Sequence, residues 1–309
     1  MANKSANWPD ITIGTWAETA KAVHLYSQVL GKVRLVTTPW TNHSWHVPLY
    51  VNARGLTTSL MFHRGVAFEM RLDLVTHEAV IESTSGQVRR VELAPSSVAG
   101  FYRSVMDELH AIGVDVRIHT TPSEIADAVP FERDDRPRPY DRDAVTRFWH
   151  ALVCMQQVFQ DFRSDFRGKC SPVHFFWGSF DLAVTRFSGR TAPPHPGGVP
   201  NFPDWAAREA YSHEVSSAGF WPGGDGTDAI FYSYAYPKPD GFENAAVEPN
   251  ASTWSDALGE FVLPYDAVRA SDKPDAALKG FLESTYRAAA DAAGWDREAL
   301  ECNLPADAR

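Results

Sequence analysis

Internal repetition constrains the fold of this chain more than any other feature of the sequence. Three pairs of segments match in order: Gly31-Lys32 with Gly168-Lys169, 46–55 with 179–189, and 101–115 with 281–296. In each copy, the Gly-Lys dipeptide follows an amphipathic helical pattern and precedes a run of aromatic and β-branched residues. One supersecondary plan present twice predicts an internal duplication, each copy being a helix–antiparallel meander–helix unit.

This plan predicts an α+β fold, because helices that follow and precede a meander pack on one face of an antiparallel sheet. We expect residues 1–121 to form the first repeat and 143–309 the second, packed as one body in a helix-grip or saddle-like arrangement. Residues 122–142 contain several prolines and charges of both signs, which predicts a linker between the copies. A ligand site is expected between the two repeats.

Hydrophobic periodicity places the individual elements. Apolar residues at spacings of three and four predict helices over 16–30, 98–112, 148–166 and 278–289. Alternation and β-branched or aromatic runs predict strands at 68–74, 80–83, 88–93, 114–118, 172–190, 210–217, 230–236 and 259–264. The segment 33–61 is expected to be extended, with prolines restricting it to edges or bulges.

The bulk composition excludes several classes of function. A net charge of −10 and a pI near 5.5 argue against a binder of nucleic acid or anionic membranes. The sequence has no apolar N-terminal signal segment and no stretch that would span a bilayer, so we expect a cytoplasmic protein without membrane partners. Three cysteines without a Cys-x-x-Cys motif indicate reduced thiols. The oligomeric state stays open.

Histidines in aromatic extended segments are the first candidates for chemistry. His46, His174 and His213 lie on three different segments and could form a facial site for a divalent metal, either zinc or iron. Alternatively, His174 and His213 act as acid–base groups and Asp181 orients one of them. No ligand pair at short spacing fixes this geometry, so a buried histidine bonded to the backbone is the competing interpretation.

Arginines and aromatic residues form the second set of candidates. Arg54, Arg186 and Arg190 fall where the strand ends of the two copies align, with Lys32 and Lys169 after the first helices. Guanidinium groups bind carboxylates and phosphates bidentately, which favours an anionic small-molecule ligand. Aromatic residues that would line the same pocket are Tyr50, Trp177 and Trp221. The alternative is ion pairing of these arginines with acidic residues of the protein itself.

Motifs for nucleophilic catalysis are absent from the sequence. Gly178-Ser179-Phe180 lacks the Gly-x-Ser-x-Gly frame, and Cys170 beside Lys169 is better explained as a structural cysteine. The glycine-rich stretch 219–226 lacks both dinucleotide and P-loop spacing, so we interpret it as a pocket rim or lid. His195 lies in a Pro/Gly-rich loop and is expected to be exposed.

Several long strings resemble a bacterial family catalogued as domain of unknown function 5996. They include Asn42-His-Ser-Trp-His-Val-Pro-Leu-Tyr50, the segment 171–190 and the segment 209–223. The resemblance covers nearly the whole chain, and strings of this length are specific. That family has no established activity, so the resemblance implies no mechanism, cofactor or site residue.

Three functions therefore remain open. The first is an enzyme with a histidine-containing, metal-dependent or acid–base site between the two repeats, acting on an anionic or aromatic substrate. The second is a binding or sensing module that uses the same arginine and aromatic pocket without turnover. The third is a structural protein without a site. The density of histidine, arginine and aromatic residues in extended segments favours the enzyme.

Overall fold

The structure is a computed structural model that describes residues 8–224 and 226–302. Within these residues it contains two antiparallel sheets and seven α-helices, so the predicted α+β class is confirmed. No helix in the described part of the chain combines the length and apolarity needed to cross a membrane.

The first half of the chain builds a sheet with strand order β1-β2-β4-β5-β6, in which β3 also pairs with β4. Its elements are α1 (Ala17–Thr37), β1 (Tyr50–Asn52), β2 (Gly55–Thr57), β3 (Met61–His63), β4 (Val66–Asp73), β5 (Glu78–Ser83), β6 (Val88–Glu92) and α2 (Val98–Ala111). The short 3-10 helices η1 (Ile13–Thr15) and η2 (Asn42–Ser44) flank α1.

The second half builds a sheet with strand order β11-β12-β10-β9-β8-β7. Its elements are α3 (Arg142–Ser164), β7 (His174–Phe176), β8 (Asp181–Thr191), α4 (Asp204–Ala210), β9 (His213–Trp221), β10 (Ile230–Tyr236), β11 (Thr253–Ser255), β12 (Glu260–Pro264), α5 (Tyr265–Arg269), α6 (Pro274–Ala292) and α7 (Arg297–Leu300). The 3-10 helices η3 (Phe131–Arg133) and η4 (Phe242–Asn244) lie in connecting segments.

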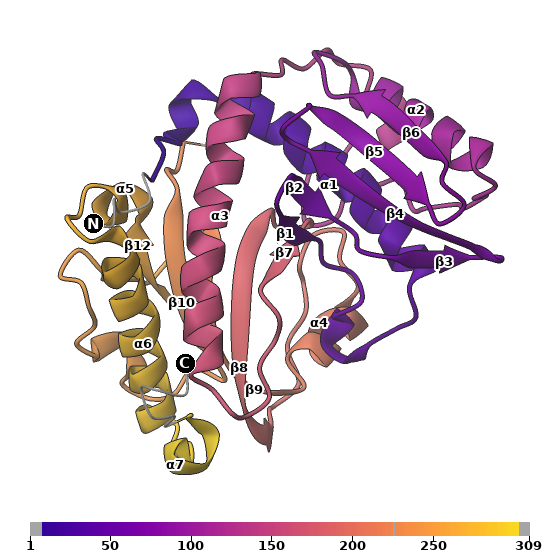
Figure 1. Cartoon of the computed structure of the whole chain (residues 1–309). Helices are drawn as coiled ribbons and strands as arrows, with labels where there is room; N and C mark the ends of the chain where they lie inside the picture. The colour runs from indigo at the N-terminus through magenta and orange to yellow at the C-terminus, as the bar shows by residue number, and fades with distance from the viewer. Residues whose placement is uncertain (1–7, 225, 303–309) are drawn as a thin grey trace.

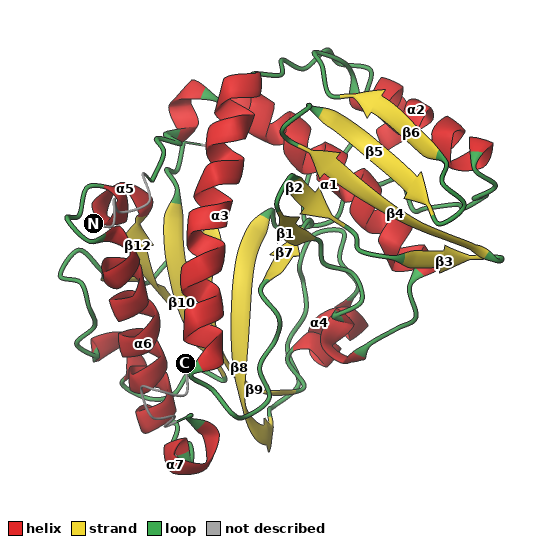
Figure 2. Cartoon of the chain, viewed as in Figure 1, coloured by secondary structure: helices red, strands yellow, loops and turns green. Residues whose placement is uncertain are grey.

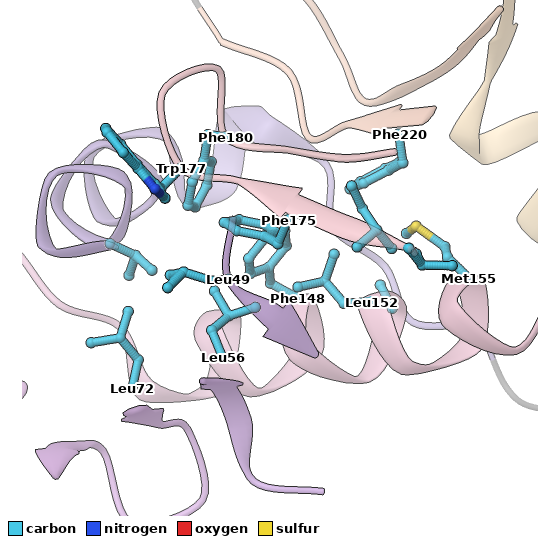
Figure 3. Packing of buried hydrophobic residues seen from close by; sticks show 14 of the residues in the cluster. Leu49, Leu56, Leu72, Phe148, Leu152, Met155, Phe175, Trp177, Phe180 and Phe220 are labelled. Carbon is cyan, nitrogen blue, oxygen red and sulfur yellow. The ribbon is translucent and has the colours of Figure 1, made fainter. Parts of the chain in front are cut away.

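The two sheets meet edge to edge. Leu49 and Phe175 exchange backbone hydrogen bonds of 2.9 Å in both directions, which joins the start of β1 to β7. Both side chains are fully buried and pack with Phe148 of α3 in one continuous core (Figure 3). The seam between the halves is therefore a hydrophobic junction as well as a backbone one.

The long helices α3 and α6 cover one face of the second sheet. In Figure 1, α3 and α6 run side by side in front of β8, β9 and β10. Arg186 of β8 points to this side, where its guanidinium donates to the carbonyl of Phe162 in α3. The opposite face of the same strands receives the short helix α4 and the loop 192–203, whose residues line a cavity together with Thr185 and Ser217. Figure 2 shows α4 as a short red helix to the right of β8 and β9. This second face is where a cavity forms.

Helix α1 is longer than its sequence pattern predicts, which corrects the assignment of 33–61 as extended. Gly31, Lys32 and Val33 lie inside the helix and are all buried. Residues 27–34 of α1 are all buried, and the exposed residues of its last turn are the apolar Leu35 and Val36, so its C-terminal turns carry no amphipathic signature. Gly31 is required there because a Cβ would lie 2.2 Å from Cδ1 of Trp177.

Other strand predictions also need correction. Residues 114–118 contain no strand, and the segment predicted as a strand over 210–217 begins with the end of α4 and enters β9 only at His213. Both segments are too short for alternation to separate a strand from irregular structure. The strands predicted at 68–74, 80–83, 88–93, 230–236 and 259–264 are all present.

The duplication itself stays a prediction. Both halves run helix, antiparallel sheet, helix, and the helices α2 and α6 are followed by Gly113 and Gly294, both with positive φ. However, Gly31-Lys32 lies within a helix whereas Gly168-Lys169 follows one, so this matched pair is not structurally equivalent. The predicted linker carries the fully buried Phe131 and the buried Asp134–Arg138 ion pair, so it packs against the body of the protein.

Candidate functional site

A cavity of about 270 Å³ lies on the face of the second sheet that α3 and α6 leave uncovered. Cross-strand neighbours form its floor, because residues paired in an antiparallel register point to the same side. The two floor rows are Ala183–Gly219–Tyr232 and Thr185–Ser217–Tyr234. The cavity therefore lies on the face of β8, β9 and β10 that is opposite to the side chain of Arg186.

Irregular segments form the roof of this cavity. The loop 192–203 contributes His195, Val199 and Phe202, and α4 and η2 close the remaining sides. Hydrogen bonds fix the loop to the rest of the chain. Among them, Tyr236 Oη donates to the Pro193 carbonyl (3.0 Å), Glu124 N to the Pro200 carbonyl (2.9 Å) and Asn201 Nδ2 to the Ile125 carbonyl (2.7 Å). Gly197 and Gly198 both have positive φ, which lets the loop turn within this roof.

Asp181 is a buried carboxyl group at the start of β8 and lines the cavity. The hydroxyl groups of Ser179 and Tyr232 donate to its two oxygens. Burial raises the pKa of Asp181, and the two hydroxyl donors partly oppose that rise. Gly219 makes room for the Tyr232 hydroxyl, since a Cβ at this position would lie 2.3 Å from it.

Glu124 provides a second carboxyl group from the segment that precedes η3. Its backbone has a left-handed φ of +62°, which is uncommon for a residue with a side chain. A Cβ on Gly178 would lie 2.0 Å from Glu124 Oε1, so this glycine allows the carboxyl group to lie against the β7–β8 turn. Burial, and secondarily the charge of Asp181, raise the pKa of Glu124 to about 7.

Tyrosine hydroxyls and a histidine ring complete the polar part of the wall. Tyr211 and Tyr234 share a hydrogen bond of 2.8 Å between their hydroxyls, and Tyr232 stacks on Tyr234 with ring centroids 6.1 Å apart. His195 stacks on Tyr211 at 4.6 Å. Burial raises the pKa of Tyr211 and Tyr232 well above the ordinary value, so both hydroxyls stay protonated hydrogen-bond donors.

A second cavity of about 440 Å³ adjoins the first. The two cavities share Glu124, Gly178 and Ser179 in their walls. The second one extends between α1, the segment 122–138 and the end of β9, where Trp221 lines it. Glu124 therefore lies at the boundary between two hollows, with access to both.

His43 at the rim of the first cavity is held neutral by a lysine. The ammonium of Lys169 donates to His43 Nε2 at 2.5 Å, so Nδ1 carries the proton and donates to the Glu209 carbonyl at 3.1 Å. Burial and the positive charge of Lys169 lower the pKa of His43. The Lys169 ammonium also lies 5.2 Å from the Trp45 ring centroid.

The three histidines proposed as metal ligands lie in separate surroundings. His46 Nδ1 accepts from the backbone N–H of Thr41 (3.2 Å), and Nδ1 of His213 lies 3.1 Å from Ser212 Oγ. His174 lies on the cavity face of β7, opposite Ala183, but is fully buried against Trp45 and Tyr50.

Neither ring nitrogen of His174 has a hydrogen-bond partner among the described residues, and burial lowers its pKa to about 3. Across residues 8–224 and 226–302, no three His, Cys, Asp or Glu side chains are arranged to hold a metal ion. The described donor set therefore does not fit zinc or iron at His46, His174 and His213, and of the predicted catalytic residues only Asp181 lines the cavity.

The predicted arginine cluster is dispersed. Arg54 pairs with Asp73 in the first sheet, and Arg190 pairs with Glu214 at 2.7 Å. Arg186 lies on the helical side, with its guanidinium carbon 3.5 Å from the Phe162 ring centroid. None of these arginines lines either cavity, so the structure does not bring them to one anionic ligand.

The aromatic candidates have different positions. Trp177 lines the first cavity and Trp221 the second, whereas Tyr50 lies outside both and stacks under the guanidinium of Arg34. Cys170 is half-buried, and the desolvation of its thiol raises the pKa to about 11, which is the opposite of thiol activation.

Sequence reasoning missed Glu124, Ser123 and the role of His195. The first two lie in the segment interpreted as a linker, and His195 lies in a loop that was expected to be exposed. The only signal available was the presence of chemistry-bearing side chains in long Pro/Gly-rich segments, which are frequent positions for functional residues.

Comparison with known proteins gives one match. The sequence profile of a family of unknown function (DUF5996) matches residues 8–302, nearly the whole chain. Neither the curated proteins nor the solved structures contain a significant match.

Proposed function

The chain belongs to this family of unknown function, DUF5996, and since the membership brings no activity with it, we propose from the geometry that it is a small-molecule enzyme. The proposed reaction is general acid–base catalysis in the first cavity, with Glu124 as the group that exchanges protons with the substrate. The observation that carries the proposal is a pair of carboxyl groups in one aromatic-lined cavity, the buried Asp181 and the half-buried Glu124.

Glu124 suits this role because a pKa of about 7 leaves it partly protonated at neutral pH. A group in that state both accepts and returns a proton at a useful rate. Strongly shifted carboxyl groups in a cavity are also a common mark of functional sites. Tyr211 supplies a protonated hydroxyl near the same space that would orient a substrate oxygen, whereas the Tyr232 hydroxyl already donates its proton to Asp181.

The charges of the residues that line the first cavity restrict the class of substrate that it would bind. None of the described residues that line the first cavity is a lysine or an arginine, whereas two are acidic. An anionic ligand would be repelled there, so we propose an uncharged substrate with an aromatic body that stacks on Trp177 and the tyrosines. A volume of about 270 Å³ favours a compact molecule.

The test is turnover of a panel of small aromatic esters, ketones and alcohols, followed by NMR in D₂O. We expect deuterium incorporation or product formation in the wild type, with a pH dependence that has an inflection near 7. Glu124→Gln should abolish turnover and the inflection together. Asp127→Asn, which removes an exposed carboxylate three residues away, is the matched control and should retain both.

Two outcomes would change the conclusion. Full activity of Glu124→Gln would refute the role of this carboxyl group. Saturable binding of an aromatic ligand to the wild type without any turnover would instead support the alternative of a binding or sensing module built on the same cavity.

A further inference from the structure

A row of buried polar side chains runs along one side of α1 behind the first cavity. His24, Gln28 and Lys32 are spaced four residues apart, so they follow one another along the helix. His24 Nε2 donates to the Gly178 carbonyl at 2.9 Å. Gln28 holds Ser123 by both backbone groups, because its Oε1 accepts from Ser123 N (2.8 Å) and its Nε2 donates to the Ser123 carbonyl (3.0 Å).

Lys32 ends this row with an amine that has no counter-charge. Its side chain is buried, with 3% of the residue exposed, and its Nζ lies 3.0 Å from Ser123 Oγ. The other close neighbour is the ring of Trp177, whose centroid is 5.6 Å from Nζ. No carboxylate of the described residues forms an ion pair with it, and burial lowers its pKa to about 8.

Burying an unpaired ammonium costs free energy unless the group gives up its proton. A lysine in such a position is therefore predisposed to act as a neutral amine and as a base. Ser123, its hydrogen-bond partner, lines the first cavity. A hydroxyl that faces a cavity and a base within about 3 Å of it are the two parts of an activated nucleophile.

We propose that Ser123 and Lys32 form a nucleophile–base pair that cleaves small aromatic carboxylic esters in the first cavity. This inference deepens the proposed function by naming its nucleophile and its substrate class. It shares the cavity with Glu124, but the serine–lysine contact is separate from the carboxyl pair. Serine with lysine as its base is one of the arrangements that replace a serine–histidine pair.

The proposed reaction balances with water as the second substrate. As Ser123 Oγ bonds to the ester carbonyl carbon, its proton passes to Lys32 Nζ. The bond to the alcohol oxygen then breaks as the protonated carboxyl group of Glu124 gives its proton to that oxygen. Water attacks the acyl-serine and the Glu124 carboxylate accepts its proton, and the lysine ammonium returns its proton to the serine oxygen when the acyl group leaves as a carboxylic acid.

The experiment uses a phenyl-substituted phosphonofluoridate, which phosphonylates activated serines and releases fluoride. Intact-mass spectrometry and peptide mapping should find one label, on Ser123, and its rate should rise with pH toward 8 as the lysine loses its proton. Ser123→Ala should remove the label. Lys32→Met should slow labelling at least 100-fold, and Lys21→Met, an exposed lysine on the same helix, should leave it unchanged.

A folding defect of Lys32→Met would not be mistaken for loss of the base, because this substitution removes a buried charge and retains the volume of the side chain. A melting temperature equal to or above that of the wild type verifies that the variant is folded. Absence of label on the wild type, label at another site only, or wild-type labelling of Lys32→Met would each overturn the proposal. Glu124→Gln labelled at the wild-type rate would support the serine–lysine pair while leaving the role of Glu124 to its own assay.

Discussion

The raised pKa of the half-buried Glu124 carboxyl group leads to a quantitative prediction about stability. Its pKa is about 7 in the folded protein, compared with a reference value of 4.5. Below pH 4.5 the group is neutral in both states and costs nothing. Above that pH the unfolded chain ionises first, so the stability of the folded state falls as pH rises and the loss is complete above pH 7. Glu124→Gln should therefore stabilise the protein, and the gain should grow as pH rises from about 4.5 to above 7.

The size of the effect follows from the shift. Each pKa unit corresponds to ~1.4 kcal/mol, so a shift of this size gives about 3 kcal/mol at pH 8 and about 1 kcal/mol at pH 5. The measurement is urea-induced unfolding of the wild type and Glu124→Gln at both pH values. Asp181 and Glu260, whose pKa values burial also raises, are present in both proteins and do not enter the difference directly.

The control is Asp127→Asn, which neutralises an exposed carboxylate in the same segment and should give nearly equal unfolding free energies at both pH values. The reasoning is refuted if the gain from Glu124→Gln is the same at pH 5 and pH 8. A loss of stability at pH 8 would show that the ionised carboxylate is well solvated or paired in the folded protein.

Three further predictions follow from buried contacts. Gly219→Ala should cost about 2 kcal/mol in urea unfolding, because the new methyl group would lie 2.3 Å from the Tyr232 hydroxyl. His174→Leu should stabilise the protein by about 2 kcal/mol at pH 5 and little at pH 8, since the depressed pKa of the folded state makes acid favour unfolding below pH 6.5. Arg186→Ala should lower the unfolding free energy by about 3 kcal/mol, because the guanidinium of Arg186 lies among aromatic rings on the helical side of the sheet. The same variant should bind a ligand in the first cavity with unchanged affinity. Weaker ligand binding by the variant would restore the interpretation of Arg186 as a substrate-binding residue.

Strands with one buried face were the easiest elements to predict from the sequence. In β4, Phe68, Met70 and Leu72 are fully buried or nearly so and alternate with less buried residues, and this alternation defines both the strand and its orientation. Helix α1 was predicted only in part, because Gly31 and Lys32 suggested a helix end. These two residues stay helical because of a tertiary contact, in which Gly31 leaves the space that the ring of Trp177 occupies. A local sequence pattern does not encode such a contact.

The site was predictable only where it coincides with a regular strand. Asp181, predicted to orient a histidine, and Trp177, predicted as an aromatic pocket residue, lie at or just before the start of β8, and both line the first cavity. His174 and His213 lie on the cavity face of the sheet, but neither lines the cavity. Trp45 and Tyr50 cover His174, and His213 lies at the rim beside His43. Strand periodicity gives the face of a side chain, whereas the covering segments decide whether it reaches a ligand.

Those covering segments explain why the chemistry is concentrated where the sequence is least regular. The helical side of the second sheet is closed by long helices, so any polar group there must be enclosed, as Arg186 is. The other side is closed by chain without periodic pattern, and such chain can present a serine, a glutamate and a histidine at angles that no helix or strand permits. Gln28 then supplies the rigidity that Ser123 lacks in a loop, because a side chain fixed on α1 binds both of its backbone groups. Ser123, in the segment predicted as a linker, thus depends on Gln28 and Lys32 in the core of α1. Burying the Lys32 amine without a counter-charge lowers the stability of the protein, and a catalytic role would explain why this cost is retained.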